Sequence, residues 1–127
     1  MAYLLDTHAV IWYLEDSFDL PVKIKDIIDD SKNKVCICAV SLWEIVIKVS
    51  LNKLVLHSPL DEALTSIKNG EFDILQIEET HLKELSKLPF LHKDPFDRLI
   101  ISTALCEDLT IITVDDNIHR YGASWIW

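Results

Sequence analysis

The stretch DPFDRLIISTALCEDLTIITVD, residues 94–115, contains a helix start, a long apolar helix and an apolar strand in direct succession. Asp94 is a typical N-cap residue and Pro95 suits the first helical turn, so a helix is predicted to continue over 98–107. The β-branched run at 110–114 then predicts a short buried strand. Alternation of this kind is typical of a parallel sheet covered by helices.

The same alternation extends over the rest of the chain. Short apolar runs predict the other strands, whereas apolar residues three or four apart, together with caps and prolines, predict the helices. The predicted strands are 3–5, 35–40, 72–77 and about 124–126, and the predicted helices are 7–15, 21–30, one opening at Ser41, 58–70, 79–88 and a short one near the C-terminus. The expected fold class is α/β, with a mostly parallel central sheet, helices on both faces, and one domain over 1–127.

Composition narrows the class of protein. Half of the 127 residues are hydrophobic, which is typical of a globular chain and not of a disordered one. No apolar stretch approaches the roughly 18 residues of a membrane span, and the N-terminus lacks a basic signal segment, so a soluble, cytoplasmic protein is expected. Three cysteines, an odd number, argue against a disulfide scaffold.

The net charge of −9 is the opposite of the basic footprint that nucleic-acid-binding proteins usually carry. Acidic residues in such excess either lie dispersed over solvated helix faces or gather in one place to hold divalent cations. The positions of the acidic residues relative to the predicted strands therefore matter more than their number.

Four acidic residues fall where a predicted strand ends or a predicted helix begins: Asp6, Glu44, Asp97 and Asp115. In a parallel sheet covered by helices, the turns after the strands meet at the carboxyl edge, where ligands bind. Crowded carboxylates raise one another's pKa, and Mg²⁺ or Mn²⁺, which prefer oxygen ligands, removes that cost. The pattern predicts a metal site at this edge, with Asp94 as a nearby extra ligand.

Each of these residues also has an ordinary structural explanation. Ser41 and Glu44 have the spacing of a capping box. A carboxylate at Asp97 is favoured by the helix dipole, and Asp115 begins an Asp-Asp-Asn turn. Asp6 follows a buried strand directly and has the fewest structural uses. Taken together, the four residues favour a shared metal site over separate caps and turns.

An ordered set of motifs resembles one known family. Its pieces are LLDTH at 4–8, SLWEI at 41–45, HKDPFDRLI at 92–100 and TVD at 113–115. Their order, spacing and total length are similar to the PIN-domain ribonucleases, and among them to the VapC-type toxins of bacterial type II toxin–antitoxin systems. The resemblance covers nearly the whole chain and implies the PIN-like three-layer fold.

The resemblance also implies an activity and its residues. It implies a metal-dependent endoribonuclease with Mg²⁺ or Mn²⁺ as cofactor, in which Asp6 and Asp97 anchor the ion, Glu44 and Asp115 orient water or a second ion, and Asp94 is accessory. Family members usually form homodimers and are neutralised by a cognate antitoxin, which often places an arginine among the acids. The expected partners are thus RNA, an antitoxin and a second copy of the chain, but no membrane.

Several further residues are expected to support this site. Thr7 and Thr113 are predicted to hydrogen-bond the carboxylates. Arg98 and Lys48 are predicted to contact substrate phosphate, and the alternative for each is an ordinary ion pair, with Asp94 for Arg98 and with Glu44 for Lys48. The histidines show no zinc-binding spacing and are expected mostly at the surface or in packing: His8, His57, His81, His92 and His119.

Two other functions stay open on the sequence. One is a catalytically silent acidic module that binds a basic peptide. The other is a phosphatase-like hydrolase with aspartates at strand ends, although such enzymes have Asp-x-Asp after the first strand and here Asp6 is followed by Thr7-His8. Loss of turnover on replacing Asp6 or Asp97 by Asn would distinguish an enzyme from a pure binding module.

Overall fold

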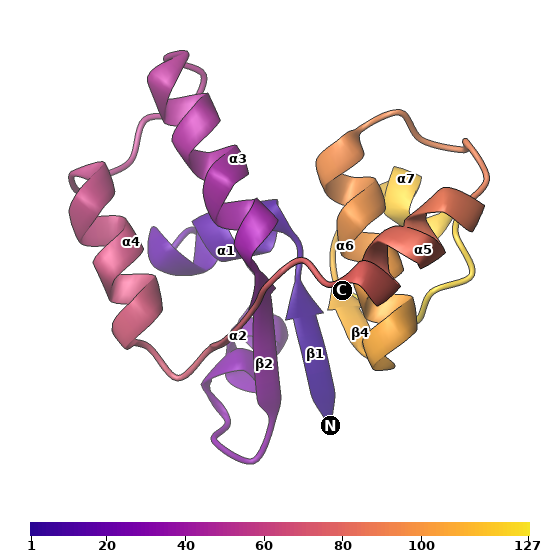
Figure 1. Ribbon diagram of the computed structural model, residues 1–127. Coiled ribbons are helices and arrows are strands. Elements are labelled where there is room, and N and C mark those ends of the chain that lie inside the picture. The colour runs from indigo at the N-terminus through magenta and orange to yellow at the C-terminus, as the bar shows by residue number, and fades with distance from the viewer.

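The structure is a computed structural model that describes residues 1–127. At its centre lies a five-stranded sheet (Figure 1). Its strands are β1 (Ala2–Leu5), β2 (Lys34–Cys38), β3 (Asp73–Leu75), β4 (Thr110–Ile112) and β5 (Trp125–Ile126). They lie in the order β3-β2-β1-β4-β5, and every neighbouring pair is parallel. The predicted parallel α/β fold is confirmed, and β1 occupies the middle of the sheet.

Seven helices cover this sheet on both faces. They are α1 (Thr7–Leu14), α2 (Val22–Asp29), α3 (Ala39–Ser50), α4 (Leu60–Asn69), α5 (Glu79–Lys87), α6 (Pro95–Glu107) and α7 (Asp116–His119). Figure 1 shows α1, α3 and α4 on one side of the sheet and α5, α6 and α7 on the other. None of these helices has the length and apolar character that crossing a membrane requires.

Alternating side chains of the strands divide the core into two clusters. In β1, Leu4 packs with residues of α6 and α7, whereas Tyr3 and Leu5 pack with residues of α1 and α2. The same alternation separates Ile111 from Ile112 in β4. Because successive strand residues point to opposite faces, apolar strands of this kind need cover on both sides, which the two helical layers provide.

The boundaries of several elements differ from those predicted. β2 ends at Cys38 and α3 already begins at Ala39, with no side-chain cap. Ser41 is therefore inside the helix, and the capping-box interpretation of Ser41 and Glu44 is wrong. The apolar pair at 39–40 looks like a strand continuation in sequence, yet the chain turns into the helix immediately after β2. β3 and β4 are likewise shorter than predicted.

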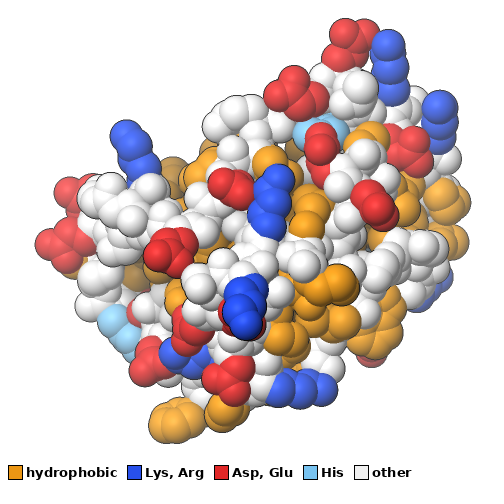
Figure 2. Space-filling view, turned by 90° about the horizontal axis from the view of Figure 1, so that it is seen from below, with side chains coloured by type: hydrophobic (Ala, Val, Ile, Leu, Met, Phe, Trp, Pro, Cys, Tyr) orange, Lys and Arg blue, Asp and Glu red, His pale blue; other side chains and the backbone are white.

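Acidic and basic side chains alternate on the surface away from the carboxyl ends of the strands. Figure 2, seen from below Figure 1, shows red carboxylates scattered among blue Lys and Arg side chains over this face. One example is the ion pair of Lys25 with Asp29 on α2, at 2.8 Å. Part of the negative charge is therefore dispersed over solvated helix faces, as one of the two explanations for the net charge anticipated.

Candidate active site

Asp6 stands at the centre of the carboxyl edge of the sheet, directly after β1, and is only 2% exposed. It caps α1, because its Oδ1 accepts a hydrogen bond from the backbone N–H of Ala9 at 2.8 Å. Its Oδ2 accepts from the hydroxyl of Thr113, which follows β4, at 2.5 Å. Both oxygens of this carboxylate are therefore held by neighbouring elements, including the expected contact from Thr113.

Glu44 reaches the same edge from α3 and is 4% exposed. Its Oε1 accepts from the hydroxyl of Thr7 at 2.6 Å, and that hydroxyl also lies 3.1 Å from the hydroxyl of Ser41. Its Oε2 pairs with Nζ of Lys48 at 3.0 Å. The predicted support from Thr7 is present, and Lys48 forms the ion pair that was the alternative to phosphate contact. Lys48 is still partly exposed, so phosphate contact stays a prediction.

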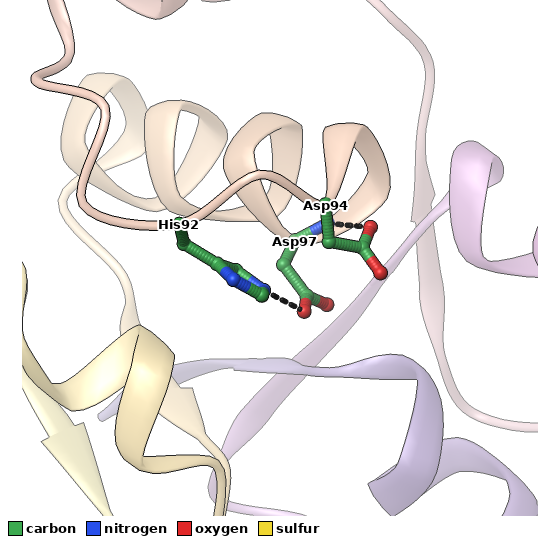
Figure 3. A group of neighbouring side chains, drawn as sticks. All are labelled: His92, Asp94 and Asp97. Atoms are coloured by element: carbon green, nitrogen blue, oxygen red, sulfur yellow. Dashed lines mark hydrogen bonds and ion pairs between the residues drawn. The ribbon is translucent and has the colours of Figure 1, made fainter.

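A third group of side chains that could bind a metal ion lies at the start of α6 (Figure 3). Asp94 caps this helix, since its Oδ1 accepts from the backbone N–H groups of Phe96 and Asp97 at 2.8 and 3.2 Å. Asp97 Oδ2 accepts from Nε2 of His92 at 2.8 Å. One ligand atom each of His92, Asp94 and Asp97 lies within 4.8 Å of the others.

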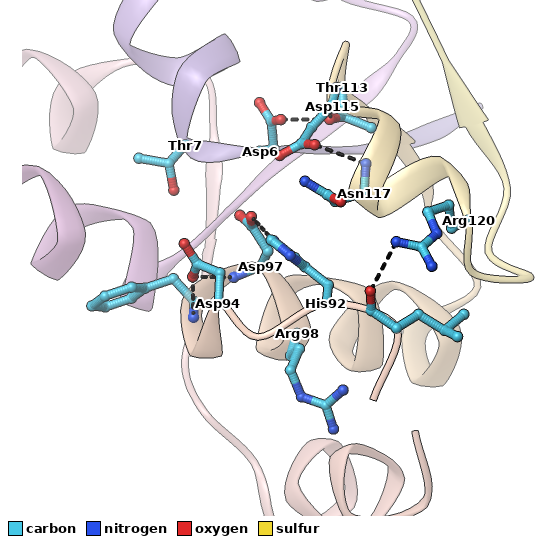
Figure 4. Close-up of polar contacts among 12 residues, drawn as sticks. Asp6, Thr7, His92, Asp94, Asp97, Arg98, Thr113, Asp115, Asn117 and Arg120 are labelled. Carbon is cyan, nitrogen blue, oxygen red and sulfur yellow. Dashed lines mark hydrogen bonds and ion pairs between the residues drawn. The ribbon is translucent and has the colours of Figure 1, made fainter. Parts of the chain in front are cut away.

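Asp115 follows β4 and caps α7, where its Oδ1 accepts from the backbone N–H of Asn117 at 2.9 Å. Its own backbone N–H donates to the hydroxyl of Thr113 at 3.0 Å, so Thr113 connects Asp115 with Asp6. Figure 4 shows Asp6, Asp97 and Asp115 gathered in one region of the structure, although they come from three different segments.

Burial and neighbouring charges shift the pKa values of two of these residues. The pKa of Asp97 is raised to about 6, chiefly by burial and further by the charges of Asp94, Glu44 and Asp115, against the lowering effect of the His92 hydrogen bond. Burial also raises the pKa of Asp6, with a contribution from Asp115. Carboxylates that destabilise one another in this way form a donor set that fits a hard divalent cation such as Mg²⁺ or Mn²⁺.

Arg98 does not face this cluster, and its predicted contact with substrate phosphate is wrong. The side chain is 6% exposed, and its guanidinium donates to the carbonyl of Pro89 at 2.9 Å and the hydroxyl of Tyr121 at 3.1 Å. It also lies over the ring of Phe90 at 4.1 Å. The alternative ion pair with Asp94 is absent too. Consecutive helix residues point in different directions, so a position next to Asp97 does not bring Arg98 into the site.

His92 is the residue that sequence reasoning missed. The expectation for the histidines holds for His81, which is buried, accepts from the backbone N–H of Glu78 through Nδ1 and contacts Glu107 through Nε2. It fails for His92, whose ring touches Asp97. The available signals were the place of His92 at the head of the motif at 92–100 and its position two residues before Asp94, and neither reveals where a loop side chain points.

The sequence of the chain matches one protein-family model. The sequence model of the PIN domain matches residues 3–124, and the chain therefore belongs to the PIN domain family. A comparison with curated protein sequences found no match.

Solved structures share this fold over nearly their whole length. One is a chain of VapBC2 from Rickettsia felis, in a structure with a DNA fragment from the VapBC2 promoter. It matches with a TM-score of 0.76 at 18% identity, and the match covers 99% of this chain and 98% of that one. For FitAcB from Neisseria gonorrhoeae the TM-score is 0.68 at 21% identity, with 100% and 97% covered. For VapBC-5 from Mycobacterium tuberculosis, a member of the VapBC family of toxin–antitoxin systems, it is 0.61 at 20% identity, with 98% and 95% covered.

Proposed function

We propose that this PIN domain is a divalent-metal-dependent endoribonuclease, a hydrolase of RNA phosphodiester bonds. The observation that carries the proposal is the convergence of acidic side chains from separate segments, in which the charges of Asp94, Glu44 and Asp115 all raise the pKa of the partly buried Asp97. A fold retains such mutual repulsion where it serves a ligand or a reaction, and strongly shifted carboxylates are typical of functional sites.

Asp6, Glu44, Asp97 and Asp115 would hold the ion, with Asp94 as an accessory ligand. A bound Mg²⁺ or Mn²⁺ supplies an activated water and stabilises negative charge on the phosphate during cleavage. The contribution of the chain is to keep its carboxylates oriented: Thr113 and the backbone of Ala9 hold Asp6, while Thr7 holds Glu44. Lys48, next to Glu44 and partly exposed, is the remaining candidate for contact with substrate phosphate.

We further propose that the chain is a VapC-type toxin that acts in the cytoplasm as a homodimer and is neutralised by a cognate antitoxin. Support comes from the likeness of its fold to chains from the VapBC and FitAcB structures, one of which is a member of a toxin–antitoxin family. The net charge of −9 suits a partner rich in arginine, because opposite charges favour association.

The test is cleavage of total RNA and transfer RNA by the purified chain in Mg²⁺ or Mn²⁺, with and without EDTA. Asp6→Asn and Asp97→Asn proteins are compared with Asp26→Asn, an exposed acidic position on α2. Discrete cleavage that EDTA and the two site substitutions abolish, and that Asp26→Asn retains, supports the nuclease. Equal cleavage by all proteins indicates a contaminating ribonuclease, and binding of a basic peptide without any cleavage favours the binding module.

A further inference from the structure

The loop between α5 and α6 is fixed through its backbone by side chains from other elements. The carbonyl of Pro89 accepts from Arg98 Nη1 and from the Tyr121 hydroxyl, both at 2.9 Å. The backbone N–H of His92 donates to the same Tyr121 hydroxyl at 3.1 Å. Arg120, labelled in Figure 4, donates to the carbonyl of Leu91 at 3.0 Å. Backbone groups of Pro89, Leu91 and His92 are thus held by side chains from α6 and from the segment after α7.

Arg98 holds this loop even though the burial of its charge is unfavourable. Its guanidinium is buried, it pairs with no carboxylate, and its hydrogen bonds go to Tyr121 and to the backbone carbonyls of Leu88 and Pro89. Taking a charged group out of water without an opposite charge is unfavourable unless hydrogen bonds compensate for it. The position of this loop is therefore set from the buried side of α6, and His92 is the loop residue that meets the acidic cluster.

The ring of His92 constrains one oxygen of Asp97. Nε2 lies 2.8 Å from Oδ2, and the two side chains are only 16% and 15% exposed. An ionised carboxylate can only accept, so the ring donates. Figure 3 shows the ring approaching Asp97 from the loop, and Figure 4 shows the carboxyl group of Asp97 directed toward Asp6 and Asp115. With Oδ2 held by the ring, the Asp97 carboxyl cannot turn freely away from the other acids.

We propose that His92 is a positioning residue for Asp97, and that Arg98 and Tyr121 hold the loop that carries His92 through their hydrogen bonds. This inference rests on the nuclease function proposed above, in which Asp97 is a metal ligand. Hydrogen-bond partners of metal ligands typically contribute 10- to 100-fold to metal affinity or activity. His92 acts here through Asp97 and not on the substrate.

The test combines Mn²⁺ affinity, measured by isothermal titration calorimetry, with steady-state RNA cleavage. We expect His92→Ala to weaken Mn²⁺ binding by roughly 10- to 100-fold and to lower kcat while KM for RNA changes little. His92→Gln, whose amide can donate from about the place of Nε2, is expected to restore most of both values. Tyr121→Phe removes the hydroxyl that bonds the loop backbone, and is expected to lower Mn²⁺ affinity and kcat by less than His92→Ala does. His57→Ala, at an exposed histidine far along the chain, is the matched control and is expected to match wild type.

Each contrary result has a separate meaning. Wild-type Mn²⁺ affinity and kcat in His92→Ala would overturn the positioning role while EDTA-sensitive cleavage still supported the nuclease. Equal losses in His92→Ala and His92→Gln, accompanied by equal drops in melting temperature, would also overturn it, because they would indicate a role in folding alone. If the wild-type chain neither binds Mn²⁺ nor cleaves RNA, the proposed function fails, and this inference fails with it.

Discussion

Asp6 and Asp97 both belong to the candidate site but are held in different ways. Asp6 directly follows β1, the middle strand of the sheet, and its two oxygens accept hydrogen bonds from the start of α1 and from Thr113. Asp97 lies in the first turn of α6, and its side chain is held by His92 from a loop. The comparison shows that the position of Asp6 is set by the sheet and its adjoining helix, whereas the orientation of Asp97 depends on how one loop is anchored.

The largest effect is expected from Asp6→Asn. The substitution removes the negative charge that follows β1. Asparagine can still cap α1, so we expect the fold to be retained. We expect RNA cleavage to fall by at least about 100-fold, with a melting temperature close to that of wild type. Cleavage rates and thermal unfolding check this. Activity within a factor of a few of wild type would remove Asp6 from the machinery.

Thr113→Val breaks the support of Asp6 without changing the carboxylate itself. The hydroxyl of Thr113 donates to Asp6 and accepts from the backbone N–H of Asp115, and the residue is fully buried. Valine keeps the shape but leaves both groups unpaired, so we expect a loss of about 1–3 kcal/mol in the free energy of unfolding and a roughly 10- to 100-fold lower Mn²⁺ affinity. Denaturant unfolding and calorimetry measure the two effects. A Thr113→Ser protein that behaves like wild type is the control.

The raised pKa of Asp97 predicts a dependence of stability on pH in the metal-free protein. Its carboxyl titrates at about 6 in the folded chain, compared with about 3.9 in an unfolded chain. Between these values the folded state binds more protons, so the contribution of this group to stability is present below pH 4 and is lost as the pH rises through 6. In EDTA at pH 7, Asp97→Asn should therefore be more stable than wild type, by up to about 3 kcal/mol.

The measurement is the difference in unfolding free energy between wild type and Asp97→Asn at several pH values from 4 to 8. We expect this difference to shrink as the pH falls, because the protonated wild-type carboxyl then resembles the neutral amide. A difference that stays constant over the whole range would contradict the raised pKa of Asp97. The comparison uses two proteins that differ at one group, so the titration of the other acidic residues cancels to first order.

The smallest effect is expected from Asp94→Asn, beside Asp97. Asp94 Oδ1 is engaged in capping α6, and asparagine caps helices about as well. We expect the free energy of unfolding to change by less than about 0.5 kcal/mol, and Mn²⁺ affinity to fall by clearly less than in Asp97→Asn. Losses as large as those of Asp97→Asn would instead make Asp94 a principal ligand.

Much of the candidate site could be predicted because it follows from chain topology. Asp6 and Asp115 follow buried strands, and once the strands are parallel their carboxyl ends must meet at one edge. Glu44 was predicted in the correct place, although the helix that carries it begins two residues earlier than expected. That error mattered for interpretation, since only a helix starting at Ser41 would have allowed a capping box.

Arg98 and His92 show where such prediction ends. The sequence places both beside an acidic residue of the motif at 92–100, yet only His92 reaches a carboxylate. Local patterns are enough to establish the alternation of strands and helices and the acidic edge, because periodicity, caps and strand direction act over neighbouring residues. Only the tertiary structure decides that Arg98 turns into the core and that His92 meets Asp97, because the path of their loop depends on hydrogen bonds with Tyr121, distant in the chain.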